Sequence, residues 1–164
     1  MIVLVVSDSH GKVDNLIRAV ELTHPDYVLH LGDVQRDLEA LRRAYPMVPM
    51  EGVPGNCDYG SEAPLTQTID LMPGHRVFAT HGHRYRVNST LDYLEQAALE
   101  EGCDIALYGH THASQCTYEN GIYVMNPGSA SCPRDGNPPS YGILDVSSAG
   151  VMTNVVFLET KTRF

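Results

Sequence analysis

The chain has 164 residues, of which 43% are hydrophobic and 19% charged, a composition typical of a globular protein with a buried core. Twenty acidic residues against eleven basic ones give a net charge of −9, which disfavours non-specific binding to nucleic-acid phosphates. No apolar run is long enough to cross a membrane, and the length favours a single domain over residues 1–164.

The first third of the chain predicts alternating strands and helices. The apolar, largely β-branched run Ile2–Val6 suits a central strand covered on both faces, and it lacks the basic flank and cleavage site of a signal peptide. Apolar residues at helical spacing in Asp14–Leu22 predict a helix that ends before Pro25. We then expect a strand, a helix and a strand over Tyr27–Leu31, Asp37–Tyr45 and Val48–Val53. This order predicts parallel strands with right-handed crossovers.

The rest of the chain is richer in strands. Thr66–Leu71 and Arg76–Thr80 flank a Pro-Gly pair, which predicts a hairpin. A helix is expected from about Thr90 to Glu101. The strands expected after it are Ile105–Tyr108, Ser114–Tyr118, Ile122–Met125, Tyr141–Val146 and Val151–Leu158. Parallel units followed by mixed or antiparallel ones predict an α/β fold in which two sheets pack face to face with helices outside.

Short polar motifs lie at the ends of the predicted strands. Their aspartate, histidine and asparagine side chains suit borderline to hard divalent metal ions and leave coordination positions for water and substrate. Because ligands bind beyond the carboxyl ends of strands in open α/β sheets, we expect these side chains to converge. The candidate metal ligands are Asp8, His10, Asp33, Asn56, His81, His110 and His112.

Most of these motifs also have an ordinary structural explanation when they are taken alone. Asp8 and His10 suit turn chemistry. Asp33 suits a helix cap, and Asn56 after a glycine suits a tight turn. The segment 109–112 is compatible with a surface loop. A metal site explains all the motifs together, and the two carboxylate oxygens of Asp33 suit a bridge between ions about 3.5–4 Å apart.

The ordered series Asp-x-His, Gly-Asp, Gly-Asn-x-Asp, His-Gly and Gly-His-Thr-His resembles the calcineurin-like metallophosphoesterase superfamily. The motifs at 55–58, 80–83 and 126–129 resemble its small branch of YfcE/MJ0936-type phosphodiesterases. The match runs from Met1 to about Val146. It implies a four-layer α/β/β/α sandwich of two mixed β-sheets flanked by helices, in agreement with the layout predicted from the strands.

The resemblance also implies a dimetal-dependent phosphoesterase, acting more on phosphodiesters than on monoesters, in which a metal-bridging hydroxide attacks phosphorus. It implies that Asp33 bridges two ions, one held by Asp8, His10 and His112 and the other by Asn56, His81 and His110. Manganese is the ion expected, with nickel, iron or zinc as substitutes. The residues expected to act in catalysis are Asn56, Asp58 and His81, and those expected to contact the substrate are Asn56, Cys57, Ser129 and Arg134.

Cys57 stands where many members of the superfamily have a histidine that protonates the leaving group. A thiol is a poorer proton donor than an imidazolium at neutral pH, and a thiolate would repel the phosphate. Cys57 is also compatible with a small, half-buried residue that has no catalytic part. We expect weak leaving-group protonation, so that esters with good leaving groups react best.

Several neighbouring residues have two interpretations each. Asp58 either orients a ligand through a hydrogen bond or caps its turn. His83 either reaches the substrate or is solvated, and Arg134 either grips a phosphate or is an ordinary surface arginine. Ser9 and Ser129 could donate hydrogen bonds to phosphate oxygens, although the sequence around Ser129 also suits a plain turn.

Other functions are compatible with the sequence. The retromer subunit Vps29 resembles this fold turned to protein binding, but here every ligand position holds a competent residue. A phosphomonoesterase or a nuclease is the further alternative, and the acidic charge without a basic arm argues against extended nucleic-acid binding. The expected partner is a small phosphodiester, and homo-oligomer formation is left open. Four cysteines without Cys-x-x-Cys spacing indicate reduced thiols in the cytoplasm.

Overall fold

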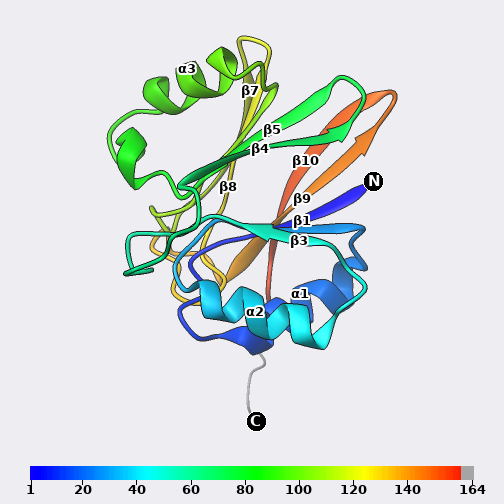
Figure 1. Cartoon of the computed structure of the whole chain (residues 1–164), viewed down its shortest axis with the longest axis vertical. Helices are drawn as coiled ribbons and strands as arrows, with labels where there is room; N and C mark the ends of the chain where they lie inside the picture. The colour runs from blue at the N-terminus through cyan, green and yellow to red at the C-terminus, as the bar shows by residue number, and fades with distance from the viewer. Residues whose placement is uncertain (160–164) are drawn as a thin grey trace.

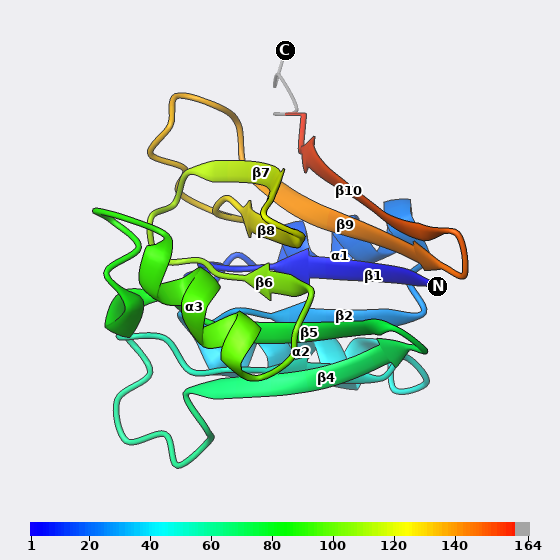
Figure 2. The ribbon, with the colours of Figure 1, turned by 90° about the horizontal axis from the view of Figure 1, so that it is seen from above.

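The computed structural model describes residues 1–159, which form two β-sheets packed face to face with helices on their outer faces (Figures 1 and 2). The helices are α1 Val13–Thr23, α2 Gln35–Ala44, the 3₁₀ turn η1 His83–Tyr85 and α3 Asp92–Glu100. The strands are β1 Ile2–Val6, β2 Tyr27–His30, β3 Met50–Gly52, β4 Thr66–Met72, β5 His75–Thr80, β6 Ile105–Leu107, β7 Ser114–Glu119, β8 Ile122–Pro127, β9 Ser140–Ser147 and β10 Gly150–Phe157.

Both sheets have five strands and mixed directions. The first has the order β10-β9-β1-β2-β3, in which β1, β2 and β3 are parallel, β9 is antiparallel to β1, and β10 is antiparallel to β9. The second has the order β4-β5-β6-β8-β7, in which β5, β6 and β8 are parallel and the edge strands β4 and β7 are antiparallel. Parallel strands bring their carboxyl ends to the same edge of each sheet.

Side chains of β1 show how the layers are held together. Val3 and Val5 pack between the two sheets, whereas Leu4 and Val6 pack under α1 and α2. Successive strand residues point to opposite faces, so a continuous apolar run is what a strand covered on both faces requires. A third apolar cluster includes Leu94 and Ala98 of α3. This helix covers the outer face of the second sheet (Figure 1).

The predicted sandwich of two mixed sheets flanked by helices is confirmed. All the predicted helices and strands occur, with ends that differ by a few residues, and β3 is three residues long where six were expected. The 3₁₀ turn at His83–Tyr85 was not predicted. Within residues 1–159, no helix has the length and hydropathy needed to span a bilayer.

Candidate metal centre

The structure brings the seven candidate ligands to one edge of the sandwich. Asp8 lies just after β1, Asp33 just after β2 and Asn56 in the loop after β3, all in the first sheet. His81 directly follows β5, and His110 and His112 lie between β6 and β7 in the second sheet. The site is therefore assembled across the two sheets from loops that their strand ends hold side by side.

Four of these residues form one half of the site, which we call the Asp8 half-site: Asp8, His10, His112 and the shared Asp33. One ligand atom from each lies within 4.8 Å of the others. Asp8 Oδ1 is 3.1 Å from His112 Nε2, and Asp33 Oδ2 is 3.7 Å from His10 Nε2. Two carboxylate oxygens and two imidazole nitrogens at this spacing are a suitable donor set for a divalent cation.

Two buried atoms of the Asp8 half-site are poorly satisfied: His10 Nε2 has no hydrogen-bond partner, and Asp8 Oδ1 has one only when the His112 ring, 3.1 Å away, is protonated. The other carboxylate oxygen of Asp8, Oδ2, accepts hydrogen bonds from the Ser7 hydroxyl at 2.7 Å and from the backbone N–H of His110 at 3.0 Å. An unsatisfied buried polar atom costs about 1–3 kcal/mol. A cation held between Asp8 and His10 would remove this cost, so the residues fit a metal ion.

The remaining residues form the Asn56 half-site: Asn56, His81, His110 and the shared Asp33. Three oxygens surround the Nε2 atom of His81, namely Asn56 Oδ1 at 3.0 Å, Asp33 Oδ1 at 3.6 Å and Asp8 Oδ1 at 3.9 Å. Asn56 Oδ1 also lies 2.9 Å from His110 Nδ1. Asp33 thus directs one carboxylate oxygen to each half-site.

Backbone carbonyls fix the tautomers of two of the histidines. His81 Nδ1 is 2.7 Å from the carbonyl oxygen of Leu31, and His112 Nδ1 is 2.8 Å from that of Cys132. A carbonyl only accepts, so each Nδ1 carries a hydrogen, and Nε2 is the nitrogen that would bind a metal ion once it carries no proton. Metal-binding histidines in proteins are held in this way.

Charges within the cluster shift two pKa values. Hydrogen bonding to Asp8 raises the pKa of His112 to about 9, against the opposing effect of burial. Burial works to raise the pKa of Asp8, but the neighbouring His112 and His81 outweigh it and leave that pKa below its usual value. The cluster therefore favours an ionised Asp8 together with positive charge beside it.

The loops that carry the ligands have strained backbone. Five candidate ligands have a positive φ, between 41° and 69°: Asp8, His10, Asp33, His110 and His112. Each such non-glycine residue costs of the order of 1–3 kcal/mol and persists only where its surroundings hold it. Gly55 shows how tight these surroundings are, since a Cβ there would lie 2.0 Å from Asp33 Oδ1. Strain concentrated in this way is characteristic of functional sites.

The structure also shows the places of the residues expected to assist. Asp58 accepts hydrogen bonds from the backbone N–H of Asp33 at 3.1 Å and of Gly55 at 2.8 Å, so it holds two ligand-bearing loops together. The exposed Cys57 donates its backbone N–H to Asp33 Oδ1 at 2.9 Å. Desolvation, reinforced by Asp33, raises the pKa of the Cys57 thiol to about 11, which keeps it neutral. Arg134 is exposed.

Two serines do not present free hydroxyls to a substrate. Ser129 is fully buried and donates its hydroxyl to the carbonyl of Asp8 at 2.8 Å. Its expected contact with phosphate stays a prediction, and it would require this hydrogen bond to break. Ser9 is also fully buried and donates to Asp37 at 2.7 Å, and the expectation that it faces phosphate is wrong. Both serines support the loop around Asp8 from within.

Sequence analysis missed several supporting residues. The Asn126 amide donates to the carbonyl of Gly109 at 3.0 Å and so steadies the loop that carries His110. His30 and Asp37 are buried and hydrogen-bonded through Ser9. His30 is hidden in an apolar strand pattern, and the only available signal was a polar residue at the end of that strand.

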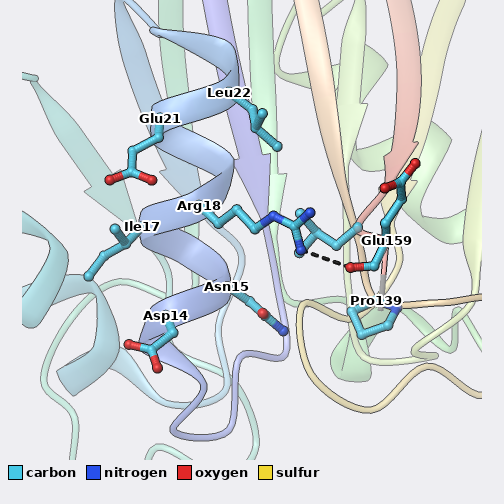
Figure 3. Close-up of a pocket in the computed structure, with 9 residues that line it drawn as sticks. Asp14, Asn15, Ile17, Arg18, Glu21, Leu22, Pro139 and Glu159 are labelled. Atoms are coloured by element: carbon cyan, nitrogen blue, oxygen red, sulfur yellow. Dashed lines mark hydrogen bonds between the residues drawn. The ribbon is translucent and has the colours of Figure 1, made fainter. Parts of the chain in front are cut away.

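A separate cavity of about 600 Å³ lies between α1 and the end of β10 (Figure 3). Arg18 crosses it and donates a hydrogen bond to the carbonyl of Glu159 at 2.8 Å. Its lining consists of Asp14, Asn15, Ile17, Arg18, Glu21, Leu22, Pro139, Leu158 and Glu159. None of the seven candidate ligands belongs to it, so it is not part of the metal centre.

Comparisons with known proteins agree with this geometry. Residues 1–149 match the family model described as the calcineurin-like phosphoesterase superfamily domain. The phosphodiesterase YfcE of Escherichia coli is 31% identical over 88% of this chain and 88% of its own length. A predicted phosphoesterase from Streptococcus pneumoniae has a solved structure with a TM-score of 0.78 and 29% identity, covering 95% of this chain and 88% of that one.

Several of the structural neighbours are Vps29 proteins. A Vps29 variant from Entamoeba histolytica has a TM-score of 0.73, covering 97% of this chain and all of its own. Its sequence is 22% identical to this one, so the likeness is one of fold alone.

Proposed function

The chain belongs to the calcineurin-like phosphoesterase superfamily of metal-dependent phosphoesterases, and from this premise we propose that it hydrolyses phosphodiester bonds with two divalent metal ions. The observation that carries the proposal is the position of Asp33. Its Oδ2 lies 3.7 Å from His10 Nε2 and its Oδ1 lies 3.6 Å from His81 Nε2, so a single carboxylate serves both half-sites. That arrangement is what a pair of bridged ions needs.

The chain's own residues prepare the site for this chemistry. When bound, two divalent ions polarise a phosphate and lower the pKa of water. Asp8, His10 and His112 would hold one ion, and Asn56, His81 and His110 would hold the other. The strained loops keep these donors in place before substrate arrives, which reduces the reorganisation that binding requires.

The donor set does not by itself choose the metal. Carboxylate and amide oxygens favour harder ions, and imidazoles are compatible with nickel, iron and zinc as well. We therefore keep manganese as the proposed ion, with these three as alternatives. Metal analysis of the purified protein decides among them.

The preference for diesters is supported by the similarity to YfcE, which is named a phosphodiesterase. Cys57 follows Asn56 and supplies no imidazole to protonate a leaving group. Its neutral thiol adds no negative charge that would repel an anionic ester. A diester with an acidic alcohol as leaving group is therefore the proposed type of substrate.

A scaffold function of the Vps29 type is the competing candidate, favoured by the shared fold. The two are separated by hydrolysis of bis-p-nitrophenyl phosphate with added Mn²⁺. Metal-dependent turnover that is lost in Asp33→Asn supports the enzyme. A folded protein that is inactive with Mn²⁺, Ni²⁺, Fe²⁺ and Zn²⁺ supports the scaffold. A parallel assay with p-nitrophenyl phosphate measures the monoesterase alternative, and a plasmid-nicking assay measures the nuclease alternative.

The cellular setting follows from the cysteines. Cys57, Cys103, Cys116 and Cys132 are all free thiols. We propose a reducing compartment such as the cytoplasm, in which thiols beside a metal centre stay reduced. Edge strand β10 is open to pairing with a second copy, and sedimentation analysis tests that arrangement.

A further inference from the structure

Three buried polar side chains form a hydrogen-bonded chain beneath the Asp8 half-site. His30 and Ser9 are fully buried and Asp37 is 3% exposed. Ser9 Oγ lies 3.0 Å from His30 Nε2 and 2.7 Å from Asp37 Oδ2. None of the three is a candidate metal ligand, yet in the sequence Ser9 lies between the candidate ligands Asp8 and His10.

The direction of each hydrogen bond can be assigned. The Gly32 N–H donates to His30 Nδ1 at 3.1 Å, so the imidazole carries its hydrogen on Nε2 and donates it to Ser9. The Ser9 hydroxyl then donates to Asp37 Oδ2, which also accepts the Gly11 N–H at 2.8 Å. Burial lowers the pKa of His30 to about 4, so the ring is neutral at neutral pH. Every donor of these three side chains therefore has an acceptor.

The hydrogen bonds among His30, Ser9 and Asp37 join the two loops that supply the Asp8 half-site. Ser9 and Gly11 belong to the loop after β1, which carries Asp8 and His10. His30 ends β2 and leads to Asp33. Backbone hydrogen bonds from Asp8 to Gly32 at 3.0 Å and from Ser9 to Asp33 at 3.1 Å run beside it.

Packing alone does not require these residues. Val28, the other residue of β2 that faces the helices, packs in an apolar cluster with Leu38 and Leu41 of α2. An aliphatic side chain at position 30 would extend that cluster without the cost of burying an imidazole. A buried histidine at position 30 is useful because its hydrogen bonds hold the strained ligand loops in place. In these loops Asp8, His10 and Asp33 have φ values of 53°, 41° and 51°.

We propose that His30 is a positioning residue that acts through Ser9 and Asp37 to hold Asp8 and His10 in register with Asp33 for metal binding. The proposal rests on the proposed function, because it concerns the same metal centre. Partners that orient metal ligands in this way typically change affinity by about 10–100-fold when they are removed. We expect an effect of that size on the Asp8 half-site.

The test measures Co²⁺ binding to the whole protein by visible absorption and calorimetry, without reference to turnover. His30→Leu and Ser9→Ala are expected to weaken the tighter Co²⁺ site by about 10–100-fold and to change its d–d spectrum. His30→Gln keeps an N–H that reaches Ser9 and should bind within about threefold of the wild type. The matched control is His75→Leu, which removes a histidine paired with Asp104 at the opposite end of β5 and should leave Co²⁺ affinity unchanged.

A double-mutant cycle separates positioning from general loss of stability. If His30 acts through Ser9, the variant that combines His30→Leu with Ser9→Ala loses no more Co²⁺ affinity than either single variant. Wild-type Co²⁺ affinity and spectrum in both single variants would overturn the inference and leave the proposed function standing. A wild-type protein that binds no Co²⁺ would overturn both. Additive losses in the double variant, or a loss in His75→Leu equal to that in His30→Leu, would also overturn the inference.

Discussion

The two halves of the candidate metal centre differ in how their polar atoms are satisfied. In the Asp8 half-site, His10 Nε2 is buried without a hydrogen-bond partner, and Asp8 Oδ1 has one only from a protonated His112. In the Asn56 half-site, the Asn56 oxygen already lies within hydrogen-bonding distance of His81 and His110. The first half gains partners when a cation binds, whereas the second exchanges existing contacts for new ones. One carboxylate, Asp33, belongs to both.

This difference indicates unequal affinities for the two ions. Each hydrogen bond that is displaced contributes about 1 kcal/mol. With the hydrogen of His81 on Nδ1, only the contact between His110 and Asn56 is such a bond, and about 1 kcal/mol weakens binding by roughly fivefold. We therefore expect the Asp8 half-site to load first and the Asn56 half-site to load second.

The largest effect is expected where the two halves meet. Asp33→Asn replaces the shared carboxylate by a neutral amide and should lower the hydrolysis of bis-p-nitrophenyl phosphate at least about 1,000-fold, since metal-ion catalysis contributes several kcal/mol. Asp104→Asn, at the opposite end of the second sheet, is the control and should retain activity. Substantial turnover in Asp33→Asn would show that no shared carboxylate is needed.

The next largest effect is on metal affinity, and it distinguishes the two half-sites. His112→Ala removes a direct ligand and should weaken the tighter ion by more than about 100-fold, beyond the effect of losing an outer partner, whereas His110→Ala should leave that ion bound and abolish the weaker one. Calorimetric titration with Mn²⁺ measures both steps. The comparison fails if the two variants lose the same ion, or if the wild type binds two ions with equal affinity.

A further prediction concerns the exposed side of the Asn56 half-site, where Cys57 replaces an imidazole. The rate should depend steeply on the acidity of the leaving alcohol across a series of aryl methyl phosphodiesters. Cys57→His should flatten this dependence by supplying a proton donor. A flat series in the wild type would mean that another group protonates the leaving alcohol.

The smallest effect distinguishes the halves by pH in metal-free protein. The pKa of His112 is raised by Asp8 to about 9, from an ordinary value of 6.5, so the pair stabilises the folded state fully below pH 6.5. This stabilisation is lost as the pH rises through about 9. Over that range the melting temperature of the wild type should fall by a few degrees towards that of His112→Gln. A constant difference between the two proteins across this range would contradict the assignment.

The strand pattern predicted the layered fold because continuous apolar runs such as Ile2–Val6 have few alternatives to a buried strand. It also predicted that the candidate ligands would meet, because parallel strands bring polar residues such as Asp8 and Asp33 to one edge. The direction of individual side chains could not be predicted in the same way. Ser9 lies between Asp8 and His10 in the sequence, yet it turns inward to His30, because residues held at positive φ break the strand alternation.

The partners of the ligands were also beyond sequence reasoning. Ser129 lies more than 100 residues from Asp8, and its contact with the Asp8 carbonyl depends on how the second sheet meets the first, whereas Asn126 reaches Gly109 within the second sheet. The backbone carbonyls that orient His81 and His112 leave no mark in the sequence at all. Residue types and strand order predicted which side chains would meet, and three-dimensional packing determined their hydrogen bonds.

The most direct test is a crystal structure of the protein soaked in Mn²⁺, with anomalous data collected at the manganese absorption edge. We predict two anomalous peaks about 3.5–4 Å apart, one on each side of the Asp33 carboxylate. A single peak, or peaks away from Asp33 with its two oxygens unbound, would contradict the account.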